Sequence, residues 1–178
     1  MARRLITGAV TEVTFLVWLI AAAPAFAASA FTAGGRPAAG SETAKWIRGQ
    51  AVQSIPTFFQ EVTAAFTATP TAGSLGDAVE ASRATFSTAE AIEFDAVLFE
   101  SGLAGTTANL QLYLFNQDGR LVVPTFFFSG VTAPADRTGF FIQLSPGSVP
   151  TGRLKWLMAI IDGFGNAFVT PFQALDVQ

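Results

Sequence analysis

From Arg83 onward, apolar and polar residues alternate in short runs that are separated by turn residues. In Ile92–Leu98, apolar side chains stand on both sides of Glu93 and Asp95, which is typical of a strand with one solvent-exposed face. The pattern predicts about seven short strands, as expected for an antiparallel sandwich: 84–86, 92–98, 110–115, 121–128, 140–144, 154–161 and 167–172. We therefore expect an all-β domain over residues 83–178.

One of these strands carries three consecutive phenylalanines. Pro124 kinks the strand 121–128, and because proline cannot donate to a ladder, the strand is expected at a sheet edge. Consecutive strand residues point to opposite faces, so Phe126, Phe127 and Phe128 leave exposed aromatic rings on one face of this edge. Either residues 31–82 cover these rings, or the rings are the contact surface for a partner chain.

Residues 28–82 form a low-complexity segment rich in Ala, Thr, Gly and Ser. Apolar residues at spacings of three and four predict a helical stripe, formed by Ile47, Ala51, Ile55, Phe58, Val62 and Phe66. Pro56 would interrupt this helix. The alternative is two extended pieces around Pro56, with Phe59–Thr67 as a strand. Residues 67–78 are expected to be a loop or linker.

The first residues have the pattern of a secretory signal. Arg3 and Arg4 precede an apolar run, and Ala25-Phe26-Ala27 supplies the small residues that signal peptidase accepts. Cleavage after Ala27 is expected, although Ala28-Ser29-Ala30 offers a second site. The competing interpretation is an uncleaved anchor, but the apolar run is about a dozen residues long, whereas a spanning helix needs about 20. We expect export to the periplasm, cell surface or medium, and no stable membrane span after cleavage.

The composition excludes several kinds of chemistry. The chain has no histidine and no cysteine, so a His-based acid–base mechanism and imidazole or thiolate metal ligation are excluded. Without cysteine there is also no disulfide, and the core must be stable by packing alone. The formal net charge is −3 and no basic run is present, which argues against nucleic acid as a partner. No cofactor is expected.

The order of turns and strands near the carboxyl end resembles the immunoglobulin-like modules of bacterial exported and surface proteins. Ser145-Pro146-Gly147, the apolar strand Leu154–Ile161 and the turn Asp162–Asn166 stand where such modules have a Pro-Gly turn, a strand and an Asp-x-x-Gly-Asn turn. The longer approach through Val149–Gly152 and the absence of a corner tyrosine depart from that pattern. The resemblance implies an immunoglobulin-like sandwich with a role in binding or assembly, and it implies no reaction.

Three groups of residues are candidates for chemistry. Asp162 and Asn166, with Asp118 from another turn, could bind Ca²⁺, or Asp162 could bond the amides of its own turn while Gly163 and Gly165 take positive φ. Paired carboxylates can hydrolyse glycosides, but Glu93 and Asp95, in an acidic group with Glu90 and Glu100, are expected on a wet sheet face. Aromatic rings could stack on sugars or fill the core: Trp46, Tyr113 and Trp156.

These observations predict a secreted or cell-envelope, non-catalytic module that binds a protein partner through the loops of the sandwich or through Phe126, Phe127 and Phe128. The first alternative is a subunit of an extracellular assembly that packs through residues 31–82. A carbohydrate-binding module is the second alternative.

Overall fold

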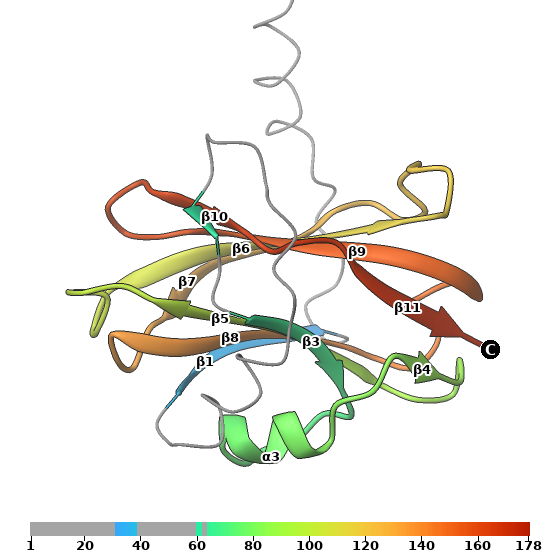
Figure 1. The fold of residues 1–178 in the computed structure, drawn as a ribbon, viewed down its shortest axis with the longest axis horizontal. Coiled ribbons are helices and arrows are strands. Elements are labelled where there is room, and N and C mark those ends of the chain that lie inside the picture. The colour runs from blue at the N-terminus through green and yellow to red at the C-terminus, as the bar shows by residue number, and fades with distance from the viewer. Residues whose placement is uncertain (1–30, 39–59, 62–63) are drawn as a thin grey trace, which may run out of the picture.

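The computed structural model describes residues 31–38, 60–61 and 64–178. Two β-sheets face each other as layers, and a short helix lies on the outer side of one of them (Figure 1). This confirms the expected all-β sandwich. Residues 1–30, which include the signal-like region, and most of the predicted helical stripe lie outside the described residues.

The smaller sheet has four antiparallel strands. Its order is β1 (Phe31–Pro37), β8 (Arg137–Leu144), β5 (Ile92–Phe99) and β3 (Ala64–Ala68). β5 and β8 are the central strands, and β1 and β3 flank them. Residues 28–82, which we expected to be a linker or packing segment, therefore contribute two strands to this sheet. Phe66 belongs to β3, so the extended alternative describes residues 64–67 correctly and the helical stripe does not.

The larger sheet has seven strands and is organised around one long strand. That strand is β9 (Gly152–Ile161), which pairs with β6 (Thr107–Phe115) on one side. On its other side it pairs with β10 (Ala167–Val169) and then with β11 (Gln173–Val177). β7 (Phe126–Thr132) pairs with β6, and two-residue strands complete the sheet: β2 (Gln60–Glu61) beside β10 and β4 (Thr85–Phe86) beside β11.

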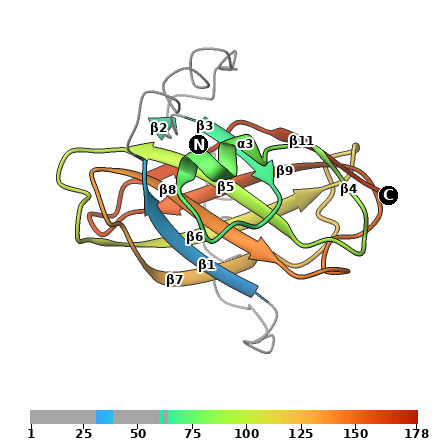
Figure 2. The same cartoon turned by 90° about the horizontal axis from the view of Figure 1, so that it is seen from below.

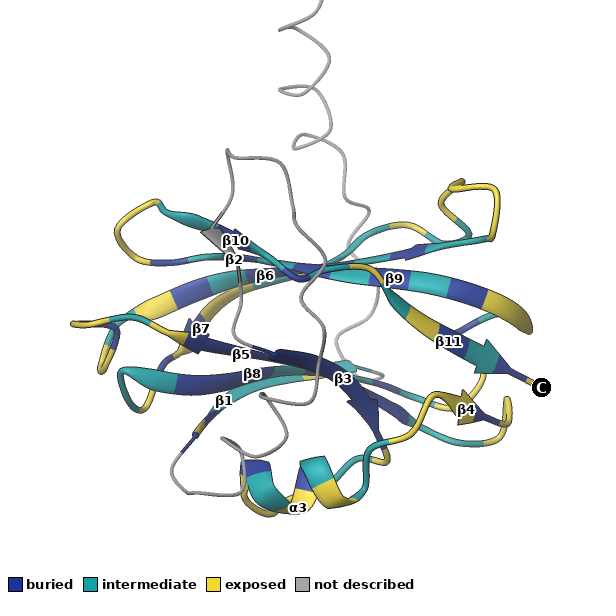
Figure 3. Ribbon diagram, in the orientation of Figure 1, coloured by how far each residue is buried: buried dark blue, intermediate teal, exposed yellow. Residues whose placement is uncertain are grey.

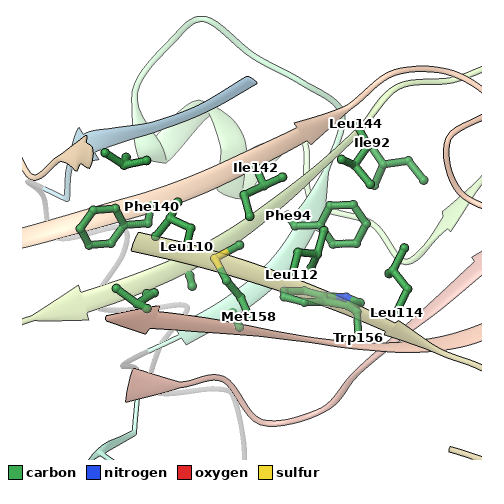
Figure 4. Close-up of a cluster of buried hydrophobic side chains, with 14 of the residues drawn as sticks. Ile92, Phe94, Leu110, Leu112, Leu114, Phe140, Ile142, Leu144, Trp156 and Met158 are labelled. Carbon is green, nitrogen blue, oxygen red and sulfur yellow. The ribbon is translucent and has the colours of Figure 1, made fainter. Parts of the chain in front are cut away.

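The inner faces of both sheets supply alternate apolar side chains to one core. The rings of Phe94 on β5 and Trp156 on β9 meet edge to face, with centroids 5.2 Å apart. Aliphatic side chains from both layers surround this pair (Figure 4), namely Leu110, Leu112, Leu114, Ile142 and Leu144. Such a core gives a chain without cysteine the packing that it needs to fold.

The helix α3 (Leu75–Glu80) lies where we expected only a loop. Ser74 caps it: the Ser74 hydroxyl accepts a hydrogen bond from the Asp77 amide, and the Asp77 carboxylate accepts one from the Ser74 amide. This reciprocal arrangement is a capping box. The helix packs on the outer side of the four-stranded sheet, and its Leu75 side chain occupies the space that a side chain at Gly139 would need.

Two of the predicted strands are interrupted near a proline. Leu121 forms only an isolated bridge with Phe115, and a regular strand starts at Phe126, because Pro124 removes a donor from the ladder. The last predicted strand, 167–172, ends at Val169, and a further strand, β11, starts at Gln173. Pro171 separates the two, so that both can pair with β9 at successive positions.

Candidate functional site: an aromatic sheet face and its edge strand

Among the described residues, the edge strand β7 pairs with β6 and with no other strand. Phe126 and Phe128 turn inward and pack against the core, and Phe126 meets the ring of Phe31 on β1 with centroids 5.2 Å apart. β1 and β7 lie side by side at this edge of the sandwich (Figure 2). Residues from the 31–82 segment thus cover part of the phenylalanine run.

Phe127 points the other way. It lies opposite Gln111 on the outer face of the seven-stranded sheet and is 50% exposed. The sequence predicts exposed aromatic rings on one face of this edge, and of the three phenylalanines only Phe127 is such a ring. Whether the edge binds a partner stays a prediction.

Phe127 belongs to a larger group of rings on this outer face, which we call the aromatic face and define as Tyr113, Phe115, Phe127 and Phe172. Tyr113 and Phe115 lie on β6 with nearly parallel rings, 6.3 Å apart at 13°. Phe172 meets Phe115 edge to face at 5.6 Å and is 56% exposed. The spaces between the rings hold side chains that are only half-buried, namely Leu157, Ala159, Ile161, Val169 and Gln111.

Little charge lies on the aromatic face. Lys155 on β9 is adjacent to Phe115 in the sheet register. Asp176, a carboxylate on the same face, lies opposite Arg153 at the far end of β11, and Glu61 of β2 pairs in register with Val169 of β10. The Tyr113 hydroxyl donates to the Gln111 side chain, and burial raises the pKa of Tyr113. The face is therefore apolar and almost neutral in a chain that carries a net negative charge.

Neither tryptophan candidate for sugar stacking is among the described residues of the aromatic face. Trp156 lies in the core and is fully buried, so it cannot stack on a sugar. Trp46 lies outside the described residues. Phe115 and Phe172 were missed as surface candidates, and the alternation that ends at Phe115 was the available signal for the first of them. No local signal identifies Phe172, because it follows Pro171 between two strands.

The paired carboxylates are not on a wet face, which corrects the prediction. Glu93 and Asp95 are fully buried, and β5 is buried on both sides along nearly its whole length (Figure 3). A second apolar cluster on the outer side of the four-stranded sheet includes Phe66 of β3 and Leu75 of α3. This layer was predicted to be linker, so the alternation was interpreted as one dry and one wet face. A substrate cannot reach either carboxyl group in this arrangement.

Asp162 organises its own turn. Its Oδ1 accepts hydrogen bonds from the amides of Phe164 and Asn166, at 2.9 and 2.8 Å, and its Oδ2 accepts one from Asn166 Nδ2 at 2.9 Å. Burial acts to raise its pKa, but these hydrogen bonds outweigh it and lower the pKa. The turn interpretation is confirmed for Asp162 and for Gly165, which has a φ of +88°, whereas Gly163 does not take positive φ.

Asp118, the third proposed calcium ligand, does not approach this turn. Asp118 follows the end of β6, whereas Asp162 lies beyond the other end of that strand, where Asn109 pairs with Ile161. Glu100 does approach the turn, and its Oε1 accepts a hydrogen bond from Asn166 Nδ2 at 3.1 Å. Burial and the nearby Asp162 carboxylate raise the pKa of Glu100. Within the described ranges, no group of three or more acidic side chains is arranged to hold a metal ion.

The fold defines the class of this protein as a two-sheet β-sandwich, and comparison with known proteins adds little to that. No protein-family model and no curated sequence matches the chain. Among solved structures, the cupredoxin domain of amoB from Nitrosocaldus yellowstonii is 11% identical, with a TM-score of 0.27 over 49% of this chain and 56% of that one. A family 123 glycoside hydrolase from Clostridium perfringens is also 11% identical, with a TM-score of 0.30 over 53% of this chain and 22% of that one.

This chain therefore spans about half of the first structure and about a fifth of the second. Likenesses at such TM-scores carry no argument about function. The β-sandwich rests on the two observed sheets, and the immunoglobulin-like assignment stays a prediction. In the part of the chain that the structure describes, no helix is long and apolar enough to cross a membrane.

Proposed function

We propose that this protein is an exported, non-catalytic binding module whose aromatic face and β7 edge dock a partner protein. The observation that carries the proposal is the position of Phe127, which is half-exposed on an edge strand and pairs with Gln111, the residue that accepts the Tyr113 hydrogen bond on the same outer face. Export is inferred from the pattern of residues 1–27, as described above.

The chemistry of the face favours a protein as the partner. Aromatic rings lie among aliphatic side chains, and Lys155 is the one charge at the centre of the described face. Interface centres in protein complexes have the same composition, because they are depleted of charge and enriched in aromatic residues. Exposed rings grouped on one side of a soluble domain are typical of an interaction site.

The test is a capture experiment with matched variants of the intact chain. The double variant Phe127→Ser and Phe172→Ser removes the two most exposed rings of the face, and Phe164→Ser removes an equally exposed ring from the Asp162 turn, outside it. We expect a native partner that co-purifies with the wild-type chain to be lost at least tenfold from the double variant and retained by Phe164→Ser. Equal thermal unfolding of the three chains excludes misfolding. Retention of the partner by the double variant would contradict the proposal.

Two other outcomes of the same experiment correspond to the alternatives. If the captured partner is the chain itself, and the double variant is monomeric where the wild type is not, the protein is a subunit of an assembly that packs through the aromatic face, whereas the sequence predicts packing through residues 31–82. If the wild type instead binds an insoluble polysaccharide and the double variant does not, the nearly parallel Tyr113 and Phe115 rings are a sugar-stacking platform. Either result would contradict the proposal that the partner is a different protein.

A further inference from the structure

A buried group of charged side chains lies on the outer side of the four-stranded sheet. Arg36 of β1 donates from Nη2 to Glu93 Oε1 on β5 at 2.8 Å, and both side chains are buried. Gln143 of β8 donates from Nε2 to Glu93 Oε2 at 2.7 Å. The Arg36 guanidinium also lies over the ring of Phe141, 4.2 Å from its centroid. Both oxygens of Glu93 therefore have partners, and its charge is matched by Arg36.

Asp95 is two residues further along β5 on the same face, and it has no such support. It is fully buried between Phe66 of β3 and Phe141 of β8 in the sheet register. Neither of its carboxyl oxygens has a hydrogen-bond partner, and Arg36 Nη1 has none either. The site thus combines two carboxyl groups with a single guanidinium.

Among the residues that the structure describes, the elements packed around Asp95 supply no second cation. β1 contributes Arg36, β5 contributes Glu93, and the neighbouring residues of β3 and β8 are uncharged. The charged residues of α3, Asp77 and Glu80, are acidic and exposed. An ionised Asp95 would be an unpaired buried charge beside the Glu93 carboxylate, which is strongly unfavourable. A neutral Asp95 has a hydroxyl hydrogen, and Glu93 is the adjacent acceptor on its own strand.

We propose that the folded protein holds Asp95 as the neutral acid, and that ionisation of Asp95 loosens the outer layer, by which we mean the edge strand β3 of the four-stranded sheet and the helix α3 that packs on the outer face of that sheet. Burial raises the pKa of Asp95 well above its ordinary range, the Glu93 carboxylate raises it further, and Arg36 lowers it. Because the folded-state pKa is raised, the stabilisation is complete below the unfolded pKa and is lost as the pH rises through the folded pKa. The layer is therefore a pH-sensitive element.

The outer layer is the part of the fold whose local opening needs the least free energy. Its buried cluster is dominated by alanines, whereas the inner core is built from large aromatic and aliphatic side chains. β3 pairs with β5 alone among the described strands, and α3 has six residues. Local opening concentrates where few apolar contacts hold an element in place.

Hydrogen exchange followed by mass spectrometry tests the proposal on the full chain. Wild type, Asp95→Asn and the control Asp118→Asn, which changes an exposed turn carboxylate in the same way, are compared at each pH from 5 to 9. We expect residues 64–80 of the wild type and the control to exchange at least tenfold faster than those of Asp95→Asn at high pH, and equally fast at low pH. Exchange in β6 and β9 should not differ among the three chains. Equal exchange in residues 64–80 at every pH, or a loss of protection spread over both sheets, would overturn the proposal.

A second measurement needs no variant, so it decides the question even if Asp95→Asn fails to fold. Carbon NMR of the wild-type chain with labelled aspartate reports the ionisation of each carboxyl group. We expect one aspartate signal to keep the position of a neutral acid at pH 7. If every aspartate is ionised at pH 7, Asp95 is not held as the acid and the proposal is wrong.

Discussion

At the scale of single residues, Asp162 uses both carboxyl oxygens within its own turn. Asp162→Ala leaves two amides and the Asn166 side chain without their acceptor, so we expect the free energy of unfolding to fall by about 1–3 kcal/mol. Asp118→Ala is the control, because Asp118 lies in an exposed hairpin turn. Urea denaturation of both variants measures the difference, and equal losses would contradict the role assigned to Asp162.

Glu90 forms hydrogen bonds that lower the pKa of its carboxyl group in the folded protein. Its carboxylate accepts hydrogen bonds from the Ser87 amide and from Arg83 Nη2, at 2.7 and 2.6 Å. The Ser87 amide first, and then Arg83, lower the pKa of Glu90 to about 2. Because the folded-state pKa is depressed, the stabilisation is present above the ordinary pKa and is lost as the pH falls toward 2.

We therefore expect Glu90→Gln to destabilise the protein at pH 7 and to have no effect near pH 2. Both partners are exposed, so the effect is small and weakens in high salt. Thermal unfolding of the two chains across this pH range provides the measurement. A constant difference between them from pH 7 to pH 2 would show that the carboxylate charge is not the cause.

At the scale of elements, α3 depends on the capping box formed by Ser74 and Asp77. Because a six-residue helix has little stability of its own, losing the cap should weaken the whole outer layer. We expect Ser74→Ala to lower the free energy of unfolding by about 1 kcal/mol, measured by urea denaturation. Ser101→Ala, in an exposed turn, should change it by less than half as much, and equal effects would contradict the prediction.

Strands with clear alternation could be predicted from the sequence. The cores of β5, β6, β8 and β9 were found because every second residue of the predicted ranges, the one on the inner face, is apolar. β1 was not found, because Phe31–Pro37 contains two glycines and one buried arginine, which do not alternate with apolar residues. α3 was not found, although Ser74 and Asp77 stand at the spacing of a cap, because Gly76 and the preceding residues read as loop.

At the scale of the whole molecule, the candidate surface could be predicted only in part. Pro124 indicated an edge strand, and β7 lies at an edge. The aromatic face could not be predicted, because it brings together residues of β6, β7 and the turn before β11, and strand order across a sheet is not encoded in local spacing. The buried state of Asp95 was missed for the same reason, since β3 and α3 cover it from outside the predicted domain.

The observed topology predicts that residues 83–178 do not form an independent domain. A fragment that lacks residues 28–82 loses β1 and β3, which flank β8 and β5. It exposes both edges of the remaining two strands and, because α3 is also lost, their outer face, so we expect no cooperative thermal unfolding and a poorly dispersed NMR spectrum. The chain from residue 28 onward is the control. Cooperative unfolding of the fragment would show that the two flanking strands are dispensable.

The pairing of β1 with β8 also constrains the time course of folding. Phe31 pairs with Leu144, so the four-stranded sheet cannot close before most of the polypeptide has been made. Contacts between residues so far apart in sequence form slowly, because a long loop must close first. A chain that stays open for this interval can be threaded through a narrow pore before it becomes rigid.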